Sequence, residues 1–302
     1  MIVAAALCAS PPLLHPALTG RAVVLPELRA ACAEAVARVL RSGPELVVVV
    51  GPAPATGEWD PDERFDPAAF APGVVSGRPV SSRVVSGRVV SGDVALDGPG
   101  PRDAGPDGAG PSGAGRGLLP LSLGLGAMLL DQAGYRGLRR LVAVGQAEPT
   151  DACAALGVEL ATKAVRTALL VMGDGSARRS LKAPGHLDPR AEPFDAHIER
   201  AVRTGRLGAL LDLDEALARD LMATGRPAWQ VLAGAMAGGR GADDAGADAG
   251  GAEGGRADFG GAEGGRADTA ELDGALSTEV LYRDDPFGVA YLVACLHPRL
   301  LE

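Results

Sequence analysis

The sequence alternates short, wholly apolar runs with segments of helical periodicity, and this alternation is what most constrains its fold. Residues 46–50 read LVVVV, a β-branched run typical of a strand that is buried on both faces. The segment 25–43 before it repeats apolar residues at helical spacing, and the run IVAAAL at 2–7 precedes that segment. A strand, a helix and a strand in this order predict a parallel crossover.

The same alternation continues through the rest of the chain. Strands are expected at 139–145 and 168–173, and two more at 279–285 and 287–296, which Pro286 separates into an edge hairpin. Helices are expected at 119–134, 151–167, 192–205, 213–225 and 227–236. The sequence therefore predicts an α/β fold: a single domain over residues 1–302, with a mostly parallel central sheet covered by helices on both faces.

Two segments do not fit this pattern, and we expect them to be disordered insertions. Residues 74–117 contain three VVSG repeats followed by a tract of Gly, Pro, Ala and charge, and residues 238–270 contain GGAEGGRAD twice. Such compositions cannot bury enough apolar surface to offset the entropy of ordering the backbone.

Charge and cysteine usage narrow the classes of partner and compartment. A net charge of −9 without a basic cluster argues against nucleic acid or an anionic membrane as partner. The four cysteines lack a CxxC spacing, which favours buried, reduced thiols. The apolar start has no basic residue before it, and no run reaches the roughly 18 apolar residues of a membrane span. We therefore expect a cytoplasmic protein, and the compositional bias towards Ala, Gly, Pro and Arg is typical of a GC-rich bacterial genome.

Three loops follow three of the predicted parallel strands: CASPPLLH, GPAPATG and GDGSARRS. The carboxyl ends of parallel strands form the crevice in which open α/β sheets bind ligands, so these loops are the expected site. The candidate residues that line this cleft are Ser10, Pro12, His15, Pro52, Ala53, Asp174, Ser176, Ala177, Arg178 and His186.

The order of several short motifs resembles a known family. The first strand ends in Cys8 and is followed by PPLL, the VVVV strand ends in a Pro turn, and later come GDGSARR, Phe194–Asp195, Trp229 five residues before a Gly-Ala pair, and PFGVAYLVA. Together they resemble class III extradiol ring-cleavage dioxygenases, of the type of the catalytic subunit of protocatechuate 4,5-dioxygenase. The likeness is greatest to shorter, actinobacterial, subunit-B-like proteins, and covers most of 1–73, 118–237 and 279–296.

The resemblance implies an Fe(II) site of two His and one Glu, but this chain lacks those residues. Ser10 and Ala53 stand where the two His are expected. The segment 223–227 has no Glu before Trp229, and Ala177 replaces the acid-base His of the family. We therefore expect a catalytically degenerate relative without a cofactor, whose cleft binds a small aromatic or anionic molecule or a partner. Family members also pair with a second subunit or with themselves.

Other uses of the same residues stay open at the sequence level. A relocated triad of His15, Asp174 and His186 would bind Fe(II) and keep ring-cleavage activity, whereas a metal-free fold would serve as a protein-interaction module. Ser176 or Ser10 would act as a hydrolase nucleophile with His186 as base, although GDGSARR is not the GxSxG elbow. We favour a capping role for Ser176.

The loop arginines and the aromatic residues each have an expected role. Arg178 and Arg179 suit an anion cradle, and pairing of Asp174 with a loop Arg is the structural alternative. Trp229 is expected to be a packing anchor, and Phe287 and Tyr291 are expected to belong to the core.

Overall fold

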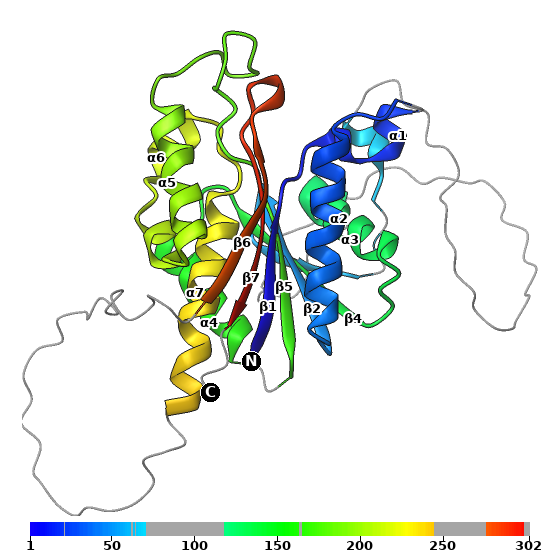
Figure 1. Cartoon of the computed structure of the whole chain (residues 1–302), viewed down its shortest axis with the longest axis vertical. Helices are drawn as coiled ribbons and strands as arrows, with labels where there is room; N and C mark the ends of the chain where they lie inside the picture. The colour runs from blue at the N-terminus through cyan, green and yellow to red at the C-terminus, as the bar shows by residue number, and fades with distance from the viewer. Residues whose placement is uncertain are drawn as a thin grey trace, which may run out of the picture.

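The computed structural model describes residues 1–20, 22–61, 63, 65–70, 118–162, 165–244 and 276–298. A seven-stranded mixed sheet in the order β3-β4-β2-β5-β1-β7-β6 forms its centre, with helices on both faces (Figure 1). The strands are β1 (Ile2–Cys8), β2 (Leu46–Ala53), β3 (Gly57–Trp59), β4 (Leu138–Gly145), β5 (Thr167–Met172), β6 (Leu276–Asp284) and β7 (Tyr291–Pro298). This confirms the predicted α/β class.

The four inner strands β4, β2, β5 and β1 run parallel, as their apolar sequences predict. Their register aligns Cys8 with Met172 and Val50 with Val171, so β1, β2 and β5 end together at one edge of the sheet. The three candidate loops therefore leave the sheet at the same edge. The terminal strands form the expected hairpin: β6 is the edge strand and β7 pairs antiparallel with β1.

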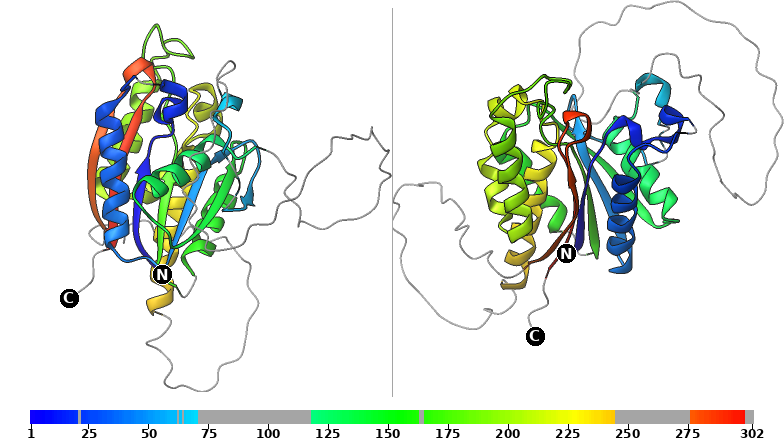
Figure 2. Two further views of the ribbon diagram at one scale, coloured as in Figure 1. Left: turned by 90° about the vertical axis from the view of Figure 1, so that its right-hand side faces the viewer. Right: turned by 45° about the horizontal axis from the view of Figure 1, so that its top comes forward.

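The helices divide into two layers, one on each face of the sheet (Figures 1 and 2). One layer holds α2 (Pro26–Arg41) and α3 (Leu121–Gln132), which pack on the inner strands. The other holds α4 (Thr150–Ala161), α5 (Ala191–Thr204), α6 (Glu215–Asp220) and α7 (Arg226–Asp244). The short α1 (Pro16–Thr19) lies in the loop after β1, and four 3-10 turns are η1 (Pro12–Leu14), η2 (Pro67–Phe70), η3 (Leu207–Asp212) and η5 (Pro286–Gly288).

Helices α4 and α7 touch through their backbones. A Cβ placed on Gly157 would lie 2.1 Å from the carbonyl oxygen of Val231, and one placed on Gly234 would lie 2.1 Å from that of Ala154. No larger residue fits at either position without moving a helix. This close contact fixes the position of α7, which carries Trp229 and Arg226.

One boundary of the predicted insertions is wrong. Helix α7 continues to Asp244, so residues 238–244 belong to a helix and not to the insertion expected at 238–270. At the start of this stretch α7 still packs on α4, since a Cβ on Gly238 would lie 3.1 Å from Val158. Residues 74–117 and 245–270 lie outside the described residues. Within the described ranges, no helix has both the length and the apolarity needed to cross a bilayer.

Candidate functional site

The ends of β1 and β5 are joined by a buried carboxylate. The backbone N–H of Ser10 donates to Asp174 Oδ1 at 2.7 Å, and Ser10 itself is buried. Burial raises the pKa of the Asp174 carboxyl to about 7, against the hydrogen bonds from Ser10 that lower it. Asp174 thus bonds to Ser10, the second residue after β1, and not to a loop arginine, which corrects the pairing considered from the sequence.

The end of β2 is joined to α7 by a buried guanidinium. Arg226 is 2% exposed, and its Nη2 donates to the carbonyls of Gln146 and Glu148 at 2.8 and 2.9 Å. Gln146 in turn donates its backbone N–H to the carbonyl of Ala53 at 3.0 Å. Arg226 Nη1 also donates to Gln230 Oε1 at 2.8 Å, so the arginine is held from several sides.

We call Ser10, Ala53, Asp174 and Arg226 the strand-end cluster. Its two halves meet through Gly225, whose backbone N–H donates to the carbonyl of Asp174 at 2.9 Å, one residue before Arg226. The structure therefore brings together residues at the carboxyl ends of β1, β2 and β5 and at the start of α7. The resemblance assigned metal ligands to three of these places.

The loop after β5 is tied to α5 by Ser176 rather than being open for nucleophilic chemistry. The buried Ser176 donates its hydroxyl to Asp195 Oδ2 and its backbone N–H to Asp195 Oδ1 at 2.9 Å. The next residue, Ala177, is also buried and donates its N–H to the carbonyl of Leu221. Arg178 Nε is buried and has no hydrogen-bond partner among the described residues.

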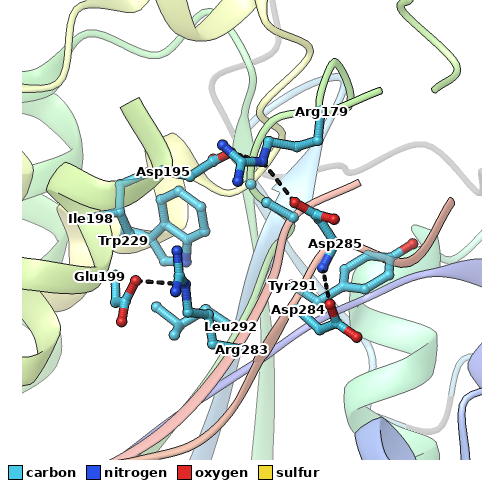
Figure 3. Close-up of a pocket in the computed structure, with 12 residues that line it drawn as sticks. Arg179, Asp195, Ile198, Glu199, Trp229, Arg283, Asp284, Asp285, Tyr291 and Leu292 are labelled. Atoms are coloured by element: carbon cyan, nitrogen blue, oxygen red, sulfur yellow. Dashed lines mark hydrogen bonds and ion pairs between the residues drawn. The ribbon is translucent and has the colours of Figure 1, made fainter. Parts of the chain in front are cut away.

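Beside the strand-end cluster lies a cavity of about 190 Å³, which we call the hairpin pocket (Figure 3). It is bounded by α5, α7, the β6–β7 hairpin and the loop after β5. Its lining residues are Gly175, Arg179, Asp195, Ile198, Glu199, Trp229, Arg283, Asp284, Asp285, Ala290, Tyr291 and Leu292. Trp229 is 2% exposed, which confirms it as a packing anchor, and it also forms part of the pocket wall.

Arg179 and Arg283 form three ion pairs around this pocket. Arg179 Nε lies 2.9 Å from Asp285 Oδ2 and 3.8 Å from Asp195 Oδ2, so the loop after β5, the hairpin turn and α5 are joined. Arg283 Nε lies 2.6 Å from Glu199 Oε2, which joins β6 to α5. In the view of Figure 3 the indole of Trp229 lies between the side chain of Arg179 and the ion pair of Arg283 with Glu199. Burial raises the pKa of the Asp195 carboxyl, although Ser176 and Arg179 oppose this.

The two candidate histidines lie apart from these groups. His15 caps α1, where its Nδ1 accepts from the backbone N–H of Ala17 at 3.2 Å, and its ring packs on Phe65. Burial and the nearby Arg29 lower its pKa. His186 is exposed in a turn at a φ of 62°. In the described part of the chain, no three His, Cys, Asp or Glu side chains are grouped so that they could hold a metal ion.

The two candidate prolines have backbone roles. Pro12 is exposed and begins the 3-10 turn η1 after β1. Pro52 is part of β2, and its carbonyl accepts from Ser122 Oγ of α3 at 2.8 Å. A Cβ on the preceding Gly51 would lie 2.5 Å from that same Oγ, so α3 sits directly against this end of β2.

Sequence reasoning missed most of the pocket. The sequence predicts only an anion cradle for Arg179, and no motif marks Asp195, Glu199, Arg283 and Asp285 as site residues. The last four come from a helix and a hairpin, and no sequence spacing predicts that these two elements meet. The hairpin turn also corrects one expectation: Tyr291 is buried, but Phe287 is 60% exposed with a φ of 63°.

Comparison with known proteins adds little to this description. No family model matches the chain, and no curated protein matches it. Among solved structures, an uncharacterized protein, JW3007, from Escherichia coli K12 is similar at 13% identity and a TM-score of 0.46. The alignment covers 98% of this chain and 99% of that one.

Proposed function

We propose that this chain is a class III extradiol dioxygenase-like protein that has lost its catalytic iron site and binds a small molecule beside the strand ends. The resemblance expects iron ligands at three places that lie far apart in the sequence: Ser10, Ala53 and the segment 223–227. All three contribute to the strand-end cluster, which supports the proposal because the ligands of a single metal ion must lie together.

The observation that carries the loss of catalysis is Arg226. It occupies the segment in which the family places its Glu ligand, and its guanidinium is buried and bonded to two backbone carbonyls. A fixed positive charge repels a ferrous ion, whereas a carboxylate would bind it. Ser10 offers only a hydroxyl and Ala53 only a methyl group, so the residues present do not fit Fe(II).

The binding role is supported by the hairpin pocket. Its cavity of about 190 Å³ is smaller than the roughly 300–1,000 Å³ of sites for drug-sized molecules, which suits a ligand of metabolite size. It combines apolar walls from Ile198, Trp229 and Leu292 with a few convergent polar groups, as small-molecule sites do.

Iron retention and ring cleavage test this proposal together. The full chain is loaded with Fe(II) without oxygen, desalted and assayed for bound iron, and catechol is then added with oxygen. We expect no retained iron and catechol recovered uncleaved. Retained iron together with oxygen-dependent ring cleavage would overturn the proposal. It would then favour the alternative of an active enzyme with relocated ligands, which His15→Ala and His186→Ala would test.

A substitution that fills the cavity tests the binding role. Leu292→Trp places a large ring in the hairpin pocket, whereas Leu138→Trp changes a leucine that is 73% exposed at the start of β4. In calorimetric titrations with small phenyl compounds, we expect Leu292→Trp to abolish the heat of binding and Leu138→Trp to preserve it. Equal binding by both variants would place the ligand elsewhere.

A further inference from the structure

We propose that the ligand of the hairpin pocket is a small organic cation, such as a primary amine on a short apolar body. This inference rests on the proposed function, since it names the ligand class of the same pocket. It differs from the anionic molecule that the loop arginines suggested from sequence alone.

The first support is the balance of charged groups around the cavity. Its lining contains two guanidinium groups, from Arg179 and Arg283. It contains four carboxyl groups, from Asp195, Glu199, Asp284 and Asp285. The carboxyl groups remain in excess even when Arg203, which contacts Glu199 but does not line the cavity, is added to the two guanidinium groups. The potential of such a concave surface attracts cations and repels anions.

The second support is that both guanidinium groups already have carboxylate partners. Arg179 contacts Asp285 at 2.9 Å and Asp195 at 3.8 Å, and Arg283 contacts Glu199 at 2.6 Å. An anionic ligand would have to displace one of these carboxylates before it could bind an arginine. A cationic ligand needs no displacement, because each carboxylate can accept several hydrogen bonds.

The third support comes from Trp229, which is 2% exposed and lines the cavity. The indole face attracts a positive charge held close to it. With Ile198 and Leu292 it supplies the apolar surface against which the body of the ligand would pack.

The shifted pKa of the Asp195 carboxyl is consistent with a cationic ligand. Burial raises the pKa of its carboxyl, and the neighbouring Asp285 carboxylate raises it further, while Ser176 and Arg179 oppose the shift. Binding of a cation close to Asp195 would favour its ionised form. Because ionisation and cation binding then support each other, amine binding should strengthen as the pH rises through the pKa of Asp195.

Three probes that share a phenyl ring separate the ligand classes: benzylamine, benzyl alcohol and benzoate. They are titrated into the full chain by calorimetry at low ionic strength and about pH 8, where carboxyl groups are normally ionised. We expect benzylamine to bind about tenfold more tightly than benzyl alcohol, in line with a hydrogen bond between charged groups. Benzoate should bind most weakly.

Two variants, which should change the affinity for benzylamine in opposite directions, test whether the preference for a cation arises in the hairpin pocket. Glu199→Gln removes a carboxylate and should weaken benzylamine binding several-fold. Arg283→Ala removes one of the two arginines that contact Glu199, the other being Arg203, so it should strengthen benzylamine binding about threefold and weaken that of benzoate. Arg136→Ala, which changes another exposed arginine between α3 and β4, is the matched control and should alter neither affinity.

The outcomes separate this inference from the proposed function. Tighter binding of benzoate or benzyl alcohol than of benzylamine, blocked by Leu292→Trp, would overturn the cationic ligand but keep the pocket as the binding site. Weaker benzylamine binding by Arg283→Ala, or no effect of either variant, would also overturn the cation inference. Failure of all three probes to bind would contradict both the ligand class and the binding role.

Discussion

The strand-end cluster and the hairpin pocket are neighbours at one edge of the sheet, yet their charged groups have different partners. In the strand-end cluster, Arg226 and Asp174 bond mainly to backbone groups of the loops that converge there, and Arg226 also lies 3.7 Å from the carboxylate of Glu215 in α6. In the hairpin pocket, Arg179 and Arg283 bond to carboxylates of other elements around an open cavity. The difference teaches that the polar residues of the cluster hold the converging loops together, whereas those of the pocket line a cavity.

The largest expected effect is that of Arg226→Met, which tests whether the cluster is structural. The change leaves two carbonyls and Gln230 without their donor in a buried place, so we expect the free energy of unfolding to fall by about 3–5 kcal/mol. Urea unfolding followed by circular dichroism measures this. Arg136→Ala at the exposed surface should change it by less than about 0.5 kcal/mol. An equally small loss for Arg226→Met would show that the cluster does not hold the loops.

Asp174→Asn should give the next largest effect, through pH. Because burial raises the carboxyl pKa to about 7 in the folded chain, the folded state binds more protons than the unfolded state between about pH 4 and 7. The free energy of unfolding should therefore fall as the pH rises through this window, by roughly 3 kcal/mol.

The amide of Asn can still accept from Ser10 but cannot ionise, so Asp174→Asn should flatten this dependence and be the more stable form at about pH 8. Unfolding curves recorded at several pH values provide the measurement. Asp212→Asn, at an exposed aspartate, should keep the wild-type profile. If the Asp174→Asn profile matched the wild type, the buried carboxyl would not be the titrating group.

Ser176→Ala tests the connection between the two regions, because Ser176 joins the loop after β5 to Asp195 of the pocket. The change removes one hydrogen bond to a partly buried carboxylate, so we expect a loss of about 1–2 kcal/mol in the free energy of unfolding. It should also raise the pKa of Asp195 further, since one group that favours its ionised form is gone. Ser277→Ala on the edge strand is a suitable control. A purely catalytic serine would leave the unfolding curve unchanged.

The smallest expected effect concerns the turn of the hairpin. Phe287 adopts a φ of 63° and is 60% exposed, so its side chain adds strain without much burial. Phe287→Gly should raise the free energy of unfolding by about 0.5–1 kcal/mol, since Gly adopts this conformation readily. The same change at Leu181, which is exposed without a positive φ, should bring no gain. A loss at Phe287 would mean that its ring contributes to the hairpin.

Sequence reasoning predicted the sheet better than the site, for physical reasons. Runs such as LVVVV and IVAAAL have few alternatives to a buried strand, and the ends of parallel strands must share one edge, so the meeting of Ser10 with Asp174 followed from topology. The hairpin pocket depends on the angle at which α5 and α7 approach β6 and β7. That angle is set by packing, including the glycine contact of α7 with α4, which no local pattern reveals.

The burial of Arg226 is likewise a feature that no local sequence pattern predicts. An arginine before a proline at a helix start reads as an exposed residue, and only the carbonyls of Gln146 and Glu148, some 80 residues earlier, make its burial favourable. Phe287 was misjudged because an aromatic residue in an apolar run normally packs inward, whereas here a tight turn directs it outward.

The position of β1 in the sheet has a consequence for biosynthesis. Ala6 pairs with Leu170 on one side and with Cys295 on the other, so β1 is made before both of the strands that flank it. At about 5–20 residues per second, β1 waits roughly 8–30 s on the ribosome before β5 has been made, and longer for β7. During this time an apolar strand with two unpaired edges is open to association with other nascent chains, so slower growth at low temperature and chaperone supply should decide the yield of folded protein.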